Sequence, residues 1–74
     1  MKAATEKVGI TLNDQPRELE SPATLQGLLG DIGLAGRRGI AAAVNGEVVP
    51  RAAWAKRTLA ERDRVLVIRA TQGG

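Results

Sequence analysis

One stretch of this sequence has the apolar spacing of an amphipathic helix, and that helix limits what the rest of the chain can build. Four large apolar side chains recur at positions i, i+3, i+4 and i+7, namely Leu25, Leu28, Leu29 and Ile32. Thr24 is a predicted N-cap, and Gly33 can end the helix in a left-handed conformation. Gly27 and Gly30 each weaken a helix by up to about 1 kcal/mol relative to alanine. We therefore expect the helix to depend on packing its apolar face against a sheet.

The sequence on both sides of this helix is patterned for strands. Period-2 alternation predicts a strand from Lys7, a turn at residues 13–15, and a second strand from Pro16. The second strand should lie at a sheet edge, because proline has no backbone N–H to donate. After a loop at 36–39, we expect an inner strand at 40–44, a type I′ turn at Asn45-Gly46 and a short strand at 47–49. A connection at 51–63 follows, with a helical turn around Trp54 and a buried anchor at Leu59. The last strand is predicted at 65–70.

This order of elements indicates one layer of sheet under one helix. It is the pattern of the α+β class known as the β-grasp or ubiquitin-like fold, with a mixed sheet of four to five strands whose first and last strands lie parallel at the centre. A chain of 74 residues has room for one domain. We expect a flexible leader at residues 1–6, the β-grasp domain at 7–70 and a flexible C-terminal tail at 71–74.

The absence of cysteine and histidine removes most of the side chains that catalysis and metal binding use. Glu18 and Glu20 share one face of the second predicted strand, and we interpret them as the charges that edge strands commonly carry. The sequence Gly36-Arg37-Arg38-Gly39 lacks the Lys-Ser or Lys-Thr of a P-loop and is interpreted as a plain loop. The protein is therefore predicted not to be an enzyme and to hold no metal or cofactor of its own.

Charge and hydropathy narrow the classes of partner. A net charge of +3 and a pI of about 10.2 are compatible with nucleic acid or with an acidic protein surface. Proteins that bind single strands stack bases on aromatic side chains, and Trp54 is the only aromatic residue, which disfavours a nucleic-acid partner. The sequence has neither a signal-peptide pattern nor a long apolar run, so we expect no membrane partner and a cytoplasmic location.

The last two residues, Gly73-Gly74, follow the predicted last strand with only Thr71 and Gln72 between. Because glycine has no side chain, such an arm can enter a narrow channel in a partner and lie close to its backbone. An α-carboxylate is ionised at neutral pH and can attack the α-phosphorus of ATP, giving an acyl-adenylate from which sulfide or a persulfide displaces AMP. The candidate site is therefore the carboxylate of Gly74, presented by Thr71, Gln72 and Gly73.

Motifs spread from Leu12 to Gly74 carry a family resemblance. They are Leu12-Asn13-Asp14-Gln15, Thr24-Leu25 with Leu28-Leu29, the block from Ala43 to Arg51 followed by Trp54, Asp63 with Val65 and Val67, and the terminal Gly73-Gly74. The block Val44-Asn45-Gly46-Glu47-Val48-Val49-Pro50-Arg51 is the most specific of them. Together they make the chain resemble the ThiS family, the sulfur carriers of bacterial thiamine (thiazole) biosynthesis.

This resemblance implies a set of partners. An E1-like adenylyltransferase would use ATP to adenylate Gly74, a cysteine desulfurase or sulfurtransferase would supply sulfur, and the resulting thiocarboxylate would donate it to the thiazole synthase. One alternative is the small subunit of molybdopterin synthase, although the Pro-Pro-rich approach to Gly-Gly common there is missing at Ala70-Thr71-Gln72. A sulfur carrier for tRNA thiolation is another. From a different class, a ubiquitin-like interaction module with an inert tail also remains open.

Two positions depart from the family pattern. Arg62-Asp63 stands where Gly-Asp is usual, so we expect a different backbone conformation in that turn. Gly27 replaces a frequent Glu and removes the reciprocal bond of a capping box. Both changes should affect local stability and not function. Of the residues near these motifs, Trp54 is predicted to pack between the strands, and Arg51 to cap or pair locally.

Two residues of the last strand are candidates for partner binding. Positions 65 and 67 match inward residues of the family, so the period of 2 sends Leu66 and Ile68 to the opposite face. Exposed apolar side chains beside a reactive tail favour a docking role. Arg64 and Arg69 can steer the protein toward an acidic partner.

Overall fold

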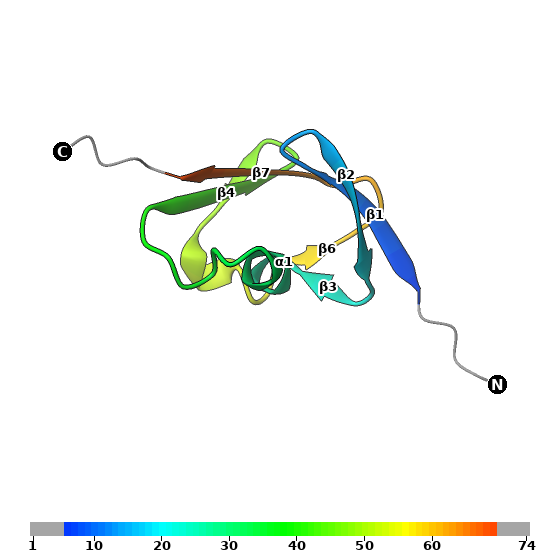
Figure 1. Ribbon diagram of the computed structural model, residues 1–74, viewed down its shortest axis with the longest axis horizontal. Helices are drawn as coiled ribbons and strands as arrows, with labels where there is room; N and C mark the ends of the chain where they lie inside the picture. The colour runs from blue at the N-terminus through cyan, green and yellow to red at the C-terminus, as the bar shows by residue number, and fades with distance from the viewer. Residues whose placement is uncertain (1–5, 70–74) are drawn as a thin grey trace.

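A five-stranded mixed sheet lies over one helix in residues 6–69, the part of the chain that the computed structural model describes (Figure 1). The predicted α+β, β-grasp architecture is confirmed. The predicted leader, apart from Glu6, and residues 70–74, which include Thr71, Gln72, Gly73 and Gly74, lie outside the described residues.

The main sheet has the strand order β2-β1-β7-β4-β5. Its strands are β1 (Lys7–Leu12), β2 (Gln15–Glu20), β4 (Ile40–Val44), β5 (Glu47–Val49) and β7 (Arg64–Arg69). The first and last strands, β1 and β7, pair in parallel, and all other neighbours in this sheet are antiparallel. As predicted, the strand that contains Pro16 lies at an edge and the parallel pair lies inside the sheet.

Two elements were missed in the sequence. They are the short strands β3 (Ala23–Thr24) and β6 (Thr58–Leu59), which form a separate antiparallel pair beside the helix. A strand of two residues is too short to show any periodicity, so only its backbone partner reveals it. The helical turn that was predicted around Trp54 is confirmed as a 3-10 helix, η1 (Arg51–Ala53), which Trp54 follows directly.

Both hairpins turn through residues with positive φ. Asn45 and Gly46 have φ of 53° and 84°, as a type I′ turn requires. The first hairpin turns in the same way at Asn13 and Asp14, with φ of 50° and 68°. Asparagine and aspartate tolerate this region better than other side chains, because they can hydrogen-bond locally. The first turn is thus one residue shorter than predicted, and Gln15 already belongs to β2.

The helix α1 (Leu25–Asp31) begins where its sequence indicates and ends one residue before Ile32, the last residue of the predicted apolar face. The side-chain oxygen of Thr24 accepts a hydrogen bond of 3.1 Å from the backbone N–H of Gly27, and Gly33 follows with φ of 80°. A Cβ at position 27 would lie 3.3 Å from the Thr24 hydroxyl, so glycine leaves this cap bond uncrowded. Ile32 lies one residue beyond the helix and is only partly buried.

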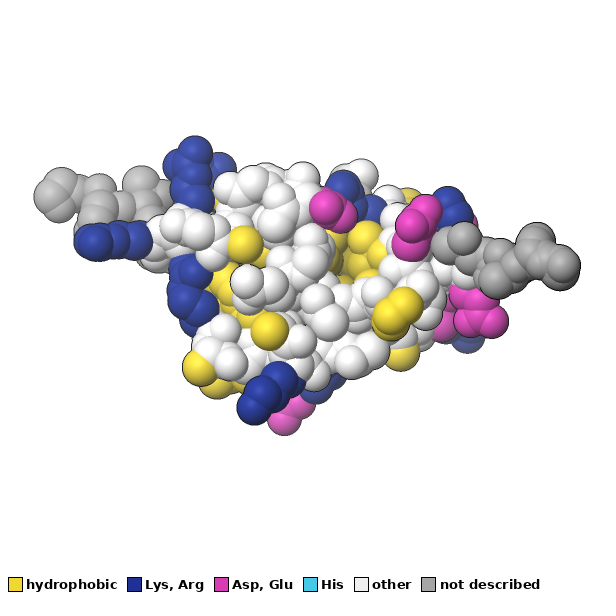
Figure 2. All heavy atoms as spheres, turned by 90° about the horizontal axis from the view of Figure 1, so that it is seen from below, with side chains coloured by type: hydrophobic (Ala, Val, Ile, Leu, Met, Phe, Trp, Pro, Cys, Tyr) yellow, Lys and Arg dark blue, Asp and Glu magenta, His cyan; other side chains and the backbone are white. Residues whose placement is uncertain are grey.

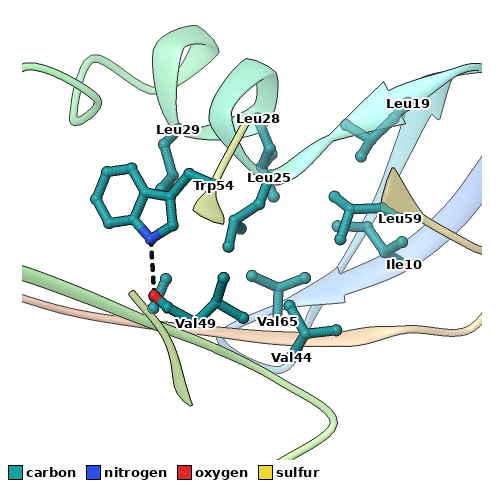
Figure 3. Close-up of a cluster of buried hydrophobic side chains, with 11 residues drawn as sticks. Ile10, Leu19, Leu25, Leu28, Leu29, Val44, Val49, Trp54, Leu59 and Val65 are labelled. Carbon is teal, nitrogen blue, oxygen red and sulfur yellow. Dashed lines mark hydrogen bonds between the residues drawn. The ribbon is translucent and has the colours of Figure 1, made fainter. Parts of the chain in front are cut away.

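The core lies between α1 and the inner face of the sheet (Figure 3). Its most buried large side chains are Leu25, Leu28, Leu29, Val44, Trp54 and Val65. The indole N–H of Trp54 donates a hydrogen bond of 2.9 Å to the carbonyl of Val49, which satisfies the one polar atom of that side chain inside the core. Trp54 therefore has the packing role predicted for it, and the predicted anchor, Leu59, is buried as well.

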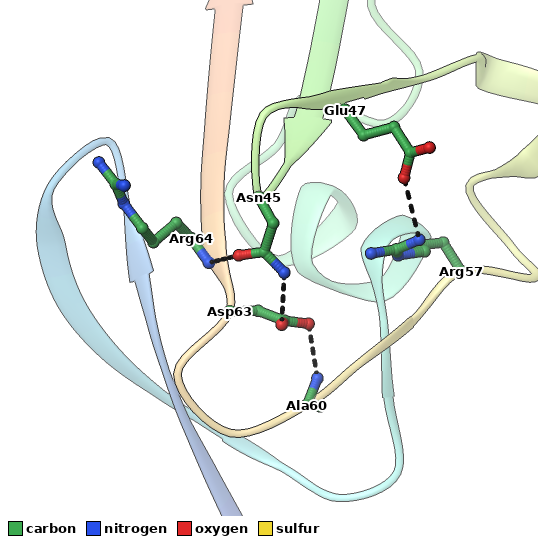
Figure 4. Close-up of polar contacts among 6 residues, drawn as sticks. All are labelled: Asn45, Glu47, Arg57, Ala60, Asp63 and Arg64. Carbon is green, nitrogen blue, oxygen red and sulfur yellow. Dashed lines mark hydrogen bonds and ion pairs between the residues drawn. The ribbon is translucent and has the colours of Figure 1, made fainter.

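The turn before β7 contains Arg62, one of the two positions that depart from the family pattern. Arg62 has φ of 73°, in the left-handed region that favours glycine, so arginine has not moved this backbone to a right-handed conformation. Contacts on both sides hold it there: the N–H of Arg62 donates to Gly9 O at 2.6 Å, and Asp63 accepts from Ala60 N at 2.8 Å and from Asn45 Nδ2 at 2.9 Å (Figure 4). This network holds the turn in its observed conformation, and the expected difference from the backbone of other family members stays a prediction.

Candidate functional site

The strand that leads to the candidate tail is held in the middle of the sheet. β7 pairs with β4 from Val65 through Arg69, whereas its register with β1 ends at Leu12 and Val65. Beyond that point the side chain of Asn13 takes over from β1, since its Oδ1 accepts from Val67 N at 2.8 Å and its Nδ2 donates to Val67 O at 3.3 Å. The described part of the chain thus ends on a strand that is anchored on both sides as far as Val67.

The two predicted docking residues lie where the strand period places them. Val65 is 1% exposed, whereas Leu66 and Ile68 are 42% and 64% exposed on the opposite face of the sheet. The predicted orientation is confirmed, and the docking role itself stays a prediction.

Sequence reasoning missed a third exposed aliphatic residue on this face. Val48, on β5, is 72% exposed. In the β4–β5 register it lies opposite Ala43, and in the β4–β7 register Ala43 lies opposite Leu66 and Ala41 opposite Ile68. We call this set of residues the outer apolar face: Ala41, Ala43, Val48, Leu66 and Ile68. The exposure of Val48 could have been predicted from the sequence, because its neighbour Val49 is buried and the period of 2 of a strand then turns Val48 outward.

The other side chains weighed for chemistry do not form a reactive cluster. Glu18 and Glu20 are exposed on the edge strand β2, as expected for charges on an edge. In the described ranges, no three acidic side chains come together as a metal site would require. Trp54 is 1% exposed and therefore presents no ring on which a nucleic-acid base can stack.

Arg51 has the local role that was predicted for it. Its guanidinium donates to the carbonyl of Ala35 at 2.6 Å and to the carbonyl of Arg37, and it lies over the Trp54 ring, 4.6 Å from the ring centroid. The carbonyls of the loop that contains Gly36 are thus turned toward an arginine of the same chain. This arrangement differs from a P-loop, whose backbone N–H groups face a phosphate.

An open groove lies away from β7, between β2, β3 and α1. Leu19, Leu28 and Pro22 contribute apolar surface to it, and Arg17 and Asp31 contribute charge. Because β1 separates β2 from β7, the groove is remote from the strand that leads to the tail. Along residues 6–69, no helix has the length and apolar character needed to cross a lipid bilayer.

Comparison with known proteins connects this geometry to a family. The family model described as the ThiS family matches residues 10–74. The chain is similar to the crystal structure of the thiamine biosynthesis protein (ThiS) from Geobacter metallireducens, with a TM-score of 0.75, 25% sequence identity and coverage of 90% of this chain and 100% of that one. It is also similar to the NMR solution structure of a thiamine biosynthesis protein from the same organism, with a TM-score of 0.73, 25% identity and coverage of 90% and 88%. No curated protein sequence matches the chain. Since the family model spans most of its length, the chain belongs to the ThiS family.

Proposed function

We propose that this protein is a sulfur carrier of thiamine biosynthesis, a co-substrate acted on by partner enzymes, and that the carboxylate of Gly74 carries the sulfur. The observation that carries this proposal is the ThiS family match, which extends through Gly74. The position of β7 supports it, because a central strand that is hydrogen-bonded on both sides gives the residues after Arg69 a rigid base. Thr71, Gln72 and Gly73 form the proposed arm, and the cytoplasm is its proposed setting.

The proposed chemistry takes place in partner enzymes. An oxygen of the Gly74 carboxylate attacks the α-phosphorus of ATP in an E1-like adenylyltransferase, so that pyrophosphate leaves and an acyl-adenylate forms. Sulfide then attacks the acyl carbon, and AMP leaves with the electron pair of the C–O bond. If a cysteine desulfurase or sulfurtransferase delivers the sulfur as a persulfide, an acyl disulfide forms first, and a thiol reduces its S–S bond to release the thiocarboxylate. The thiazole synthase is the proposed acceptor, and ATP is a substrate of the activating partner.

Intact-mass spectrometry tests this proposal. Incubation with the activating enzyme of the same organism, ATP and a sulfide source is expected to raise the mass of the chain by about 16 Da, because one carboxylate oxygen is replaced by sulfur. A control without ATP should show no change. Transfer of that sulfur to thiazole synthase, but not to the large subunit of molybdopterin synthase, is the second expected result. An unchanged mass with an active enzyme would contradict the carrier role, and transfer only to the molybdopterin enzyme would contradict the assignment to thiamine.

We further propose that the outer apolar face docks on the activating enzyme. Replacing Leu66 and Ile68 together by threonine keeps a good strand residue at both positions while removing apolar contact area. A loss of about 1.4 kcal/mol of binding free energy corresponds to a tenfold rise in KM, and the area of two aliphatic side chains is enough to supply it. We expect KM for the carrier to rise about tenfold and the unfolding midpoint to stay within error. Val48→Thr, two strands away from β7, should have a smaller effect, and an unchanged KM in the double variant would refute the docking role.

A further inference from the structure

Three exposed arginines gather at the end of the sheet where β7 finishes. Arg69 lies opposite Ile40 in the β4–β7 register, and Arg37 and Arg38 precede Ile40 by three and two residues. At 3.8 Å per residue, and with paired Cα atoms up to about 5.5 Å apart, the Cα of Arg38 lies within about 13 Å of the Cα of Arg69. Figure 2 shows Lys and Arg side chains gathered at this end of the molecule, with no Asp or Glu among them on the face in view. We call Arg37, Arg38 and Arg69 the arginine cluster.

The loop that carries two of these arginines is fastened to the core. Arg51 donates to the carbonyls of Ala35 and Arg37, and its guanidinium stacks on Trp54, which is itself buried and hydrogen-bonded. The N–H of Arg37 also donates to the carbonyl of Leu34, at 3.1 Å. The backbone of Arg37 is therefore held close to the core, and Arg38 is the next residue along the chain. Charges held in place lose less conformational entropy when they meet a partner than charges on a freely moving loop.

Carboxylates of the same chain do not neutralise this cluster in the described structure. The sequence has no Asp or Glu in residues 32–46 or 48–60, the segments that contain Arg37, Arg38 and Arg51. Across residues 6–69, the ion pair that forms joins Arg57 to Glu47, at 4.0 Å, and does not involve the cluster. Like charges gathered in this way repel one another, and an acidic surface relieves that repulsion.

We propose that the arginine cluster docks on an acidic protein surface at the mouth of the channel in which the activating enzyme takes up the tail, an inference that rests on the proposed function. Five residue steps separate Arg69 from Gly74, and an extended chain of that length spans at most about 17 Å. The cluster thus meets the rim of the channel, while the reacting carboxylate lies deeper. Ile68 precedes Arg69 on β7 and belongs to the outer apolar face, on the other side of the sheet; the two surfaces meet at the end of this strand, where apolar area supplies affinity and the arginines supply orientation and association rate.

The observations favour an acidic protein over the other anionic partners. Nucleic-acid binders add aromatic stacking to their basic surface, and the one aromatic ring of this chain is buried under Arg51. The phosphates of ATP react at Gly74, at the far end of the arm from Arg69. An acidic rim around the channel is the partner that matches both the charge and the position of the cluster.

Kinetics with the full chain and the activating enzyme of the same organism test this inference. In the double variant Arg37→Glu and Arg38→Glu, KM for the carrier in thiocarboxylate formation should rise at least about tenfold at low salt, with kcat unchanged at saturation. The gap between variant and wild type should close as salt is raised, because screening weakens the attraction. The matched control is Lys7→Glu with Arg17→Glu, which changes the net charge equally beside the remote groove and should leave KM unchanged. Thermal unfolding of each variant shows that the domain is intact.

The results that would contradict the docking of the arginine cluster can be told apart. A double variant with the wild-type KM at every salt concentration would overturn the inference. So would a fall in kcat at constant KM, which would place the arginines at the reacting phosphates, or an equal rise in KM in the control. Salt-sensitive binding of single-stranded DNA that the double variant loses while keeping its KM would overturn it as well. If the wild-type chain gains no sulfur at all, the proposed function fails instead, and with it the premise of the cluster.

Discussion

Removing Gly74 is expected to abolish the gain of sulfur while leaving the domain folded. The deletion moves the terminal carboxylate back by one residue, about 3.5 Å in an extended chain. A misplacement of 1 Å at a reacting centre can reduce a rate by about a hundredfold, so the loss should be at least that large. Intact-mass spectrometry after incubation with activating enzyme, ATP and sulfide provides the measurement.

Two further variants distinguish the effect of the length of the arm from the effect of its last side chain. Adding one alanine after Gly74 lengthens the arm and should be as damaging as the deletion, whereas Gly74→Ala keeps the carboxylate in place and should retain part of the activity. The buried core runs from Ile10 to Val65, so the unfolding midpoint of all three should equal that of the wild type. Thiazole synthesis that continues unimpaired with the deletion variant, while the chain gains no sulfur, would point to the ubiquitin-like interaction module with an inert tail.

Replacing Trp54 by alanine is expected to unfold most of the protein at room temperature. Truncation of a buried Trp costs about 3–5 kcal/mol, and a domain of this size has a total stability of about the same magnitude. The loss has three sources in the structure: the core contacts of the ring, its hydrogen bond to Val49, and the base on which Arg51 stacks. Circular dichroism during urea unfolding measures the effect.

Trp54→Phe is the matched control for that substitution. It keeps an aromatic ring in the core but leaves the carbonyl of Val49 without its donor, which costs about 1–3 kcal/mol. The phenylalanine variant should therefore remain folded with a lowered urea midpoint. An alanine variant that unfolds cooperatively within about 1 kcal/mol of the wild type would show that Trp54 does not organise the core.

Much of this fold could be predicted because its elements follow simple periods. The spacing of Leu25, Leu28 and Leu29 predicts α1, and the alternation around Ile10 predicts β1. Asn45-Gly46 predicts its hairpin because few other residue pairs accept two positive φ angles in succession. The strands β3 and β6 escaped, since two residues show no period and their pairing depends on a contact between distant segments. The left-handed backbone of Arg62 could not be predicted for a related reason, because the bonds around it come from other parts of the chain.

The candidate site also has a part that the sequence predicts and a part that only the structure reveals. The exposure of Leu66 and Ile68 follows from the strand period alone, and the structure confirms it. The arginine cluster could not be predicted, because only the register of β4 with β7 brings Arg37 and Arg38 beside Arg69. Arg51 was correctly expected to act locally, but its partners, the carbonyls of Ala35 and Arg37, lie more than ten residues away in sequence.

The parallel pairing of β1 with β7 also sets the order of events when the chain folds. The central strand of the sheet, β7, follows the other described strands in sequence. Thr11, on β1, therefore pairs with Arg64, which is 53 residues further along the chain. Contacts this distant in sequence close late, because the entropy of a long loop must be lost first. The five-stranded sheet therefore cannot be completed on the ribosome before the residues of β7 have emerged. A chain that ends short of Val65 lacks β7, and with it a buried core residue and the two exposed residues, Leu66 and Ile68, that are proposed for docking.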